Sequence, residues 1–199
     1  MRVVLATGNA GKIREFAELL GPLGFEFVAQ AAFGIEPPEE TGDTFEANAL
    51  LKARYAAARS GLPAMADDSG LEVDALGGAP GVRSARYAGA GAGDLANLQK
   101  LLQVMQGVDD STRAARFRCV VALVRDADDP APIFGRGVWE GRILREPRGS
   151  GGFGYDPIFA PVGESRSVAE LPSMEKHAHS HRGQALRDLV ANWRGGAPR

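Results

Sequence analysis

The segment 4–12 constrains the fold more than any other part of the chain, because an apolar run ends there in small and polar residues and a helical pattern begins at once. The run is typical of a short buried strand, and the apolar positions of 13–20 recur at helical spacing. Gly8 and Gly11 allow close backbone approaches that side chains forbid. Main-chain N–H groups at the start of the helix can then face a bound anion, with Lys12 beside them.

This outline of a phosphate site is not specific by itself. The P-loop pattern requires Gly where the chain has Ala6 and Ser or Thr where it has Ile13, so the P-loop interpretation fails, and the GxGxxG pattern is missing too. An ordinary strand-to-helix turn with a surface lysine is the alternative that this segment leaves open.

Composition and charge restrict the class of protein. A chain of 199 residues with 44% hydrophobic and 24% charged residues predicts one folded domain, or one domain with two lobes. The formal net charge of -2 provides no basic footprint, so we expect no nucleic acid as the main partner. The single cysteine, Cys119, suits a reducing compartment, and no apolar run approaches the ~20 residues of a membrane span. We therefore expect a cytoplasmic protein without a membrane partner.

Strands and helices alternate early and strands dominate the middle, which predicts an α/β protein with a mixed sheet. Further strands are expected at 25–29, 62–66, 115–124 and 158–160, with a hairpin or a pair of strands at 133–144. Asp43 and Asp94 are predicted to cap the second and third helices, and the apolar stripe of the latter includes Leu95. A last helix carries Leu186, Leu189, Val190 and Trp193, and the tail 195–199 is expected to fray.

Two neighbouring carboxylates, Asp67 and Asp68, follow the apolar run 62–66. Neighbours on a strand point to opposite faces, so one of them is expected to face a given cleft and the other to serve the scaffold. Glu39 and Glu40 in an earlier loop can complete an oxygen-rich magnesium site, because magnesium commonly takes one or two carboxylates plus water and phosphate. A pair of solvated carboxylates is the alternative.

Aromatic and basic residues gather in the last third of the chain. Phe153, Tyr155 and Asp156 lie in a glycine-rich loop and suit a nucleobase, with a ring for stacking and an oxygen for an N–H edge; aromatics that cap the core are the alternative. A His-rich cluster follows, which indicates a metal site, a polar site or a charged helix start: Lys176, His177, His179, His181 and Arg182.

Several longer motifs occur in a consistent order over nearly the whole chain: AlaThrGlyAsnAlaGlyLys (6–12), GluGluThrGly (39–42), Asn48, AlaAspAspSerGlyLeu (66–71), LeuGlyGlyAlaProGly (76–81), SerAlaArgTyr (84–87), GlyGlyPheGlyTyrAspProIlePhe (151–159) and SerHisArgGlyGlnAla (180–185). Together they resemble the inosine triphosphate pyrophosphatase family, also called XTP/dITP diphosphatases. The resemblance implies a magnesium-dependent hydrolase that converts ITP, dITP and XTP to the monophosphate and pyrophosphate. It also implies a long central sheet with flanking helices, two lobes around an active-site cleft, and a homodimer.

The resemblance assigns roles to individual positions. Asp68 is implied as the proton acceptor that activates water and as a magnesium ligand with Glu40, and Ser69 is implied to contact substrate. Triphosphate binding is implied for Thr7, Gly8, Asn9, Ala10, Gly11 and Lys12. Base binding is implied for Phe153, Gly154, Tyr155, Asp156, Lys176, His181 and Arg182. A pyrophosphatase of broader or pyrimidine specificity, and a nucleotide-binding protein without turnover, are the alternatives.

Overall fold

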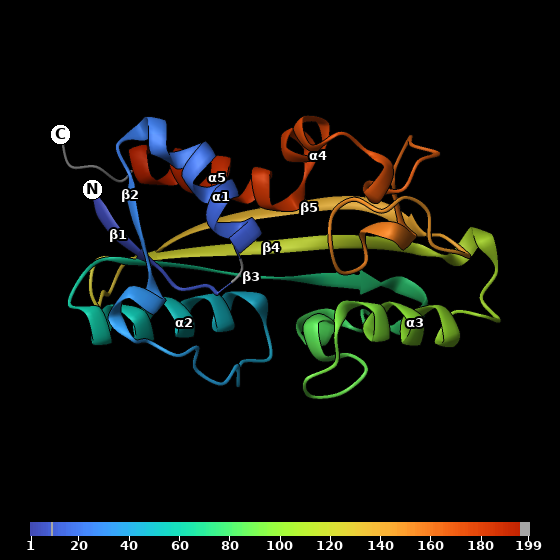
Figure 1. Cartoon of the computed structure of the whole chain (residues 1–199), viewed down its shortest axis with the longest axis horizontal. Helices are drawn as coiled ribbons and strands as arrows, with labels where there is room; N and C mark the ends of the chain where they lie inside the picture. Colours follow the sequence, from blue (N-terminus) through green and yellow to red (C-terminus); the bar gives the residue numbers. More distant parts are fainter. Residues whose placement is uncertain (9, 196–199) are drawn as a thin grey trace. The chain divides into compact units, whose positions relative to one another are not determined.

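The computed structural model describes residues 1–8 and 10–195, and in these residues six strands form one sheet in the order β2-β1-β3-β4-β5-β6 (Figure 1). The strands are β1 (Arg2–Leu5), β2 (Glu26–Ala29), β3 (Ala64–Val73), β4 (Ala114–Val124), β5 (Ile133–Ile143) and β6 (Phe159–Pro161). The helices are α1 (Ala10–Leu20), α2 (Phe45–Ser60), α3 (Asp94–Val104), α4 (Ser173–His179) and α5 (His181–Gly195). β1 pairs in parallel with β2 and β3, whereas β5 and β6 are antiparallel, which confirms the predicted mixed sheet.

The chain divides into two compact units, each with a core of its own. Unit 1 comprises residues 1–68, 119–137 and the chain from His181 on, and unit 2 comprises 69–118 and 138–180. Three of the boundaries between the units fall inside β3, β4 and β5, and the fourth lies between α4 and α5.

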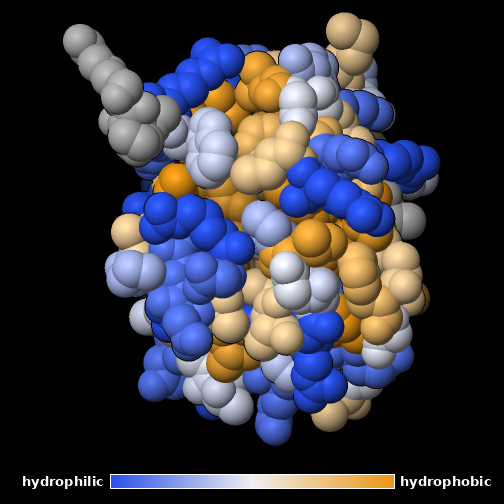
Figure 2. All heavy atoms as spheres, turned by 90° about the vertical axis from the view of Figure 1, so that its left-hand side faces the viewer, coloured by the Kyte–Doolittle hydropathy of each residue, from blue (hydrophilic) through white to orange (hydrophobic). Residues whose placement is uncertain are grey.

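The core of unit 1 joins α1 and α5 to the sheet, through side chains such as Phe16 on α1 and Leu186 on α5. α2 lies on the other face of this part of the sheet (Figure 1). Its buried positions Ala49, Ala53 and Ala56 are small, so the helix backbone can lie close to the strands. At the end of the molecule drawn in Figure 2, hydrophobic surface is visible between hydrophilic side chains.

The core of unit 2 packs α3 against β3, β4 and β5, with Leu98 and Leu101 on the helix and Phe117 and Trp139 on the strands. Unit 2 also contains a buried guanidinium, that of Arg113. Arg113 donates to the main-chain oxygens of Ile143, Met105, Val108 and Leu144 at 2.8 to 3.3 Å. These bonds satisfy a charged group that would be costly to bury without partners.

Several details of the sequence prediction are wrong. β3 continues as one strand through Asp67 and Asp68, so the two carboxylates lie inside a strand and not after one. β5 is a single strand with no turn at Glu140 and Gly141, because both residues continue the extended backbone. Thr44 and not Asp43 caps α2, since its side chain accepts a hydrogen bond from the N–H of Ala47 at 3.1 Å.

α3 also differs from its prediction, and the C-terminal tail is described only in part. Gly93 is the N-cap residue of α3, with no side-chain capping bond, and Leu95 is 67% exposed because it faces away from the core. Of the tail expected to fray, Gly195 ends α5 and 196–199 lie outside the described residues. No helix in the described part of the chain is long and apolar enough to cross a membrane.

Candidate active site

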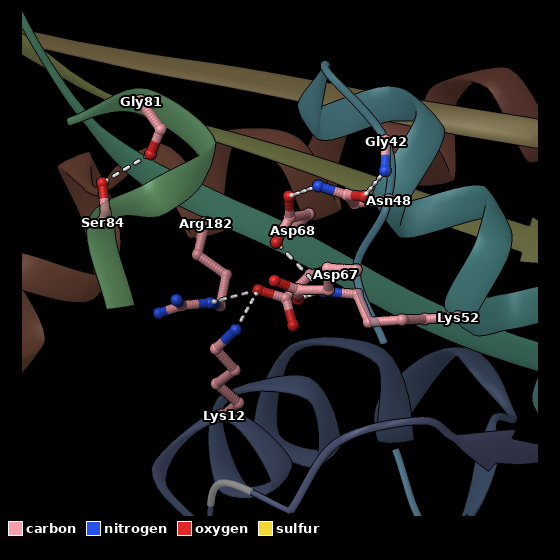
Figure 3. Close-up of polar contacts among 10 residues, drawn as sticks. Lys12, Gly42, Asn48, Lys52, Asp67, Asp68, Gly81, Ser84 and Arg182 are labelled. Atoms are coloured by element: carbon pink, nitrogen blue, oxygen red, sulfur yellow. Dashed lines mark hydrogen bonds and ion pairs between the residues drawn. The ribbon is translucent and has the colours of Figure 1, made fainter. Parts of the chain in front are cut away.

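Asp68 is the centre of a buried polar cluster in unit 1 (Figure 3). Lys52 on α2 places its Nζ 3.0 Å from Asp68 Oδ1 and 2.7 Å from Glu40 Oε1. Asn48, on the same helix, donates from Nδ2 to Asp68 Oδ2 at 3.2 Å. The ammonium group of Lys52 thus joins the carboxylates of Glu40 and Asp68, which are 28 residues apart in the sequence.

Local structure explains how α2 supplies both partners. Asn48 and Lys52 are four residues apart, so they lie on the same face of the helix. The Oδ1 atom of Asn48 accepts from the N–H of Gly42 at 2.8 Å, which ties the loop that carries Glu40 to the helix. A Cβ atom at position 42 would lie 2.7 Å from that oxygen, so the close approach requires glycine.

The charges of this cluster influence one another. Burial raises the pKa of Asp68 and the nearby Glu40 raises it further, against the opposite effect of Lys52. Burial lowers the pKa of Lys52, but the carboxylates of Asp68, Asp67 and Glu40 outweigh burial, so its pKa is raised overall. Lys52 therefore stays charged at neutral pH, while Asp68 is a stronger base than an exposed aspartate.

Asp67 makes a second ion cluster, with partners on α1 and α5. Its Oδ2 atom lies 2.8 Å from Lys12 Nζ and 3.5 Å from Arg182 Nε. Burial alone would raise the pKa of Asp67, but the charges of Lys12 and Arg182 outweigh it and hold the pKa well below its usual range. These ion pairs join Asp67 to α1 and α5 and Asp68 to α2, in agreement with the alternation of strand side chains.

The aromatic loop of unit 2 forms a third cluster. The ring of Phe153 is 41% exposed, and Lys176 Nζ lies 4.9 Å from its centroid. Asp156 is buried, and its Oδ2 atom accepts from Lys176 Nζ at 2.7 Å and from the N–H of Phe153 at 2.9 Å. Gly152 has φ +73°, and a Cβ atom there would lie 2.0 Å from Asp156 Oδ2, so this turn requires glycine.

Tyr155 differs from its neighbour Phe153 in exposure. Its ring is only 5% exposed and belongs to the core of unit 2, so the core-capping alternative describes it better than an exposed stacking surface. Its hydroxyl donates to the main-chain oxygen of Ser84 at 2.8 Å.

The remaining candidate residues take the following places. Thr7 and Gly8 lie between β1 and α1, and Asn9 lies outside the described residues. Ala10, Gly11 and Lys12 begin α1, Ser69 follows Asp68 in β3, and Gly154 lies in the aromatic loop. His181 is buried at the start of α5, next to Arg182. His177 and His179 belong to α4, a helix that the sequence pattern did not separate from α5.

Glu40 and Asp68 fit a magnesium ion by chemistry and by placement. Both are hard oxygen donors, and both direct an oxygen at one positive charge, the ammonium of Lys52. In the part of the chain that the structure describes, no three His, Cys, Asp or Glu side chains gather as a metal site. Water and phosphate oxygens would therefore complete the coordination, as is usual for magnesium.

The sequence patterns do not identify Lys52 as a site residue, and they include Asn48 in a motif without giving it a role. Their spacing of four residues on a predicted helix was the available signal. It shows which residues share a face, but it does not show that Asp68 lies opposite that face.

Comparisons with known proteins agree over nearly the full length. The model of the Ham1 family matches residues 3–192. A Shigella flexneri protein named dITP/XTP pyrophosphatase is 58% identical over 98% of this chain and 99% of its own. A solved structure of a HAM1 protein from Coxiella burnetii superposes with a TM-score of 0.92 at 51% identity, covering 98% of this chain and 100% of that one. The solved structure of the Staphylococcus aureus Ham1 protein superposes with a TM-score of 0.87 at 36% identity, covering 99% of this chain and 100% of that one.

Proposed function

The chain belongs to the Ham1 family, and we propose that it hydrolyses the non-standard purine nucleoside triphosphates ITP, dITP and XTP to the monophosphate and pyrophosphate. This reaction clears deaminated purines from the nucleotide pool. The buried Asp68, held by Lys52 and Asn48, is the observation that carries the proposal. A protein that only binds nucleotides does not need a water-activating carboxylate beside cationic groups.

The triphosphate is assigned to the start of α1, from Thr7 to Lys12. Main-chain N–H groups at a helix start and the helix dipole favour an anion there. Lys12 is held 2.8 Å from Asp67, and Arg182 lies on the same carboxylate. This pairing holds the two positively charged groups at one carboxylate, where they can also contact a phosphate.

Asp68 is assigned as the proton acceptor. A water molecule adds across the anhydride between the α- and β-phosphates, its proton passes to an oxygen of Asp68, and pyrophosphate leaves. The raised pKa of Asp68 suits this role, because a stronger base takes the proton more readily. Lys52 and Lys12 stabilise the negative charge that develops on the leaving pyrophosphate.

Asp68 and Glu40 would hold magnesium, and we propose that the activity depends on it. The ion supplies Lewis-acid polarisation of phosphate oxygens when it is bound. Ser69, next to Asp68 on β3, is assigned to substrate contact.

Base recognition is assigned to Phe153, Gly154, Tyr155 and Asp156, with Lys176, His181 and Arg182. Phe153 offers the exposed ring, and the buried Tyr155 and Asp156 hold its loop. Donors that face the 6-oxygen of hypoxanthine or xanthine would be left unpaired by the 6-amino group of adenine. Such a loss costs about 1–3 kcal/mol for each group, which favours 6-keto purines.

The oligomeric state and the cellular location are proposed from the sequence. We propose a homodimer on the family resemblance. We propose the cytoplasm because the single cysteine, Cys119, is buried and suits a reducing compartment.

Pyrophosphate release by the purified protein from ITP, XTP, dITP, ATP, GTP and dTTP, with and without magnesium, tests the proposal. Fast magnesium-dependent release from ITP, dITP and XTP alone is the expected result. Similar rates on all six substrates would support the pyrophosphatase of broader specificity. Absence of release from every substrate would leave the nucleotide-binding protein without turnover as the better interpretation.

A further inference from the structure

The SerAlaArgTyr motif (84–87) has no part in the chemistry above. Its first residue, Ser84, makes hydrogen bonds to three other segments of unit 2. The buried Ser84 accepts from the N–H of Leu71 through Oγ at 2.9 Å and donates from Oγ to the Gly81 oxygen at 2.6 Å (Figure 3). Its main-chain oxygen accepts the hydroxyl of Tyr155 at 2.8 Å. Ser84 therefore connects β3 to the aromatic loop.

A second connection to the same loop comes from α3. Asp94 is the first residue of α3, and its Oδ2 atom accepts from the N–H of Gly154 at 2.9 Å. One turn further on, Asn97 is buried and donates from Nδ2 to the Ala85 oxygen at 3.0 Å. The start of α3 thus contacts the aromatic loop and also the segment that holds Tyr155.

Phe153 needs such support, because glycines flank it. Gly152 has φ +73° and Gly154 has φ +60°. Glycine has the widest backbone freedom of any residue, so two of them would let the exposed ring take many orientations. Bonds to the main chain of Gly154, to the hydroxyl of Tyr155 and to Asp156 restrict this freedom before any ligand arrives.

We propose that Asp94, together with the Tyr155–Ser84 bond, positions the Phe153 ring for the purine base, so that Asp94 is a positioning residue for substrate selectivity. This inference rests on the proposed function, which assigns the base to the aromatic loop. A platform ordered in advance binds more tightly because less conformational freedom is lost on binding. The effect is expected in the Michaelis constant and in discrimination between bases, and not in the chemical step.

Three variants test the proposal: Asp94→Ala, Asp94→Asn and Tyr155→Phe. The alanine variant loses the acceptor for the Gly154 N–H, whereas asparagine keeps an oxygen there and should restore the wild-type values. Tyr155→Phe loses only the hydroxyl and keeps the ring in the core. Asp128→Ala is the matched control, because Asp128 is exposed and belongs to a loop of unit 1.

Two readouts separate this inference from the proposed function. Amide hydrogen exchange at 152–156 should become faster in Asp94→Ala and Tyr155→Phe, and unchanged exchange would overturn the anchoring itself. With ITP, both variants should raise the Michaelis constant about tenfold at nearly constant turnover, and the ratio of ITP to ATP efficiency should fall. Faster exchange with an unchanged Michaelis constant and ratio would overturn the role in base selection. Wild-type protein that does not cleave ITP at all would instead refute the proposed function, and the exchange data would still decide the anchoring.

Discussion

Asp67→Asn is the substitution that most directly tests how the positive groups of unit 1 are held. The change keeps the shape of the side chain but removes a negative charge whose side chain is only 1% exposed. Lys12 Nζ and Arg182 Nε, which lie 2.8 and 3.5 Å from Asp67 Oδ2, would then lose this counter-charge. Removal of one partner from a buried ion pair costs about 3–5 kcal/mol. Since the Lys12 side chain is 18% exposed, water can relieve part of the loss, and we expect about 3 kcal/mol.

Urea unfolding at neutral pH measures this loss as a decrease in the free energy of unfolding, and pyrophosphate release from ITP measures its functional effect. The Michaelis constant should rise, because Lys12 is no longer directed at one place. Asp128→Asn on an exposed loop is the matched control and should leave both quantities unchanged. A decrease of less than about 1 kcal/mol in Asp67→Asn would refute the argument, since that is the range of a surface ion pair.

A double-mutant cycle identifies the partner through which Asp67 acts. Lys12→Met combined with Asp67→Asn should lower stability by clearly less than the sum of the two single changes, because both changes remove the same interaction. Additive effects would show that Lys12 and Asp67 do not interact in the folded protein.

Three further predictions concern the other charged residues. Asp68→Asn should abolish pyrophosphate release but leave ITP binding in equilibrium dialysis nearly intact, and wild-type turnover would contradict its role as proton acceptor. Lys52→Met should leave the carboxylates of Asp68 and Glu40 without their shared cation, so magnesium should raise its Tm more than that of the wild type; an equal rise would contradict the fit of the two carboxylates to a cation. The hydrogen bonds from Arg125 lower the pKa of Asp129. Asp129 therefore stabilises the fold fully at pH values above its pKa in the unfolded chain, which is 3.8, and this stabilisation is lost as acid protonates the carboxylate. Asp129→Asn should therefore lower the free energy of unfolding by about 1–3 kcal/mol at neutral pH, with a difference that shrinks in acid; a constant difference down to acid pH would contradict this assignment.

Local patterns were sufficient to predict the elements that surround the candidate site. The passage from β1 to α1, the small apolar face of α2 and the position of the aromatic loop depend on residues that are neighbours in sequence. The same holds for the opposite directions of Asp67 and Asp68, which follow from strand geometry alone. The long motifs also indicated the family to which the chain belongs, and the comparisons confirm that family.

The choice of partners for these side chains was decided by the tertiary structure. Asp94 has the sequence context of a helix cap, yet its carboxylate bonds to Gly154, 60 residues away. Lys52 could have pointed into solvent, yet it lies between Asp68 and Glu40. Helix and strand periodicity determine which face a side chain occupies, because they depend on the local backbone. Which group lies opposite that face depends on how distant segments pack, and a side chain takes the partner that best compensates its lost hydration there.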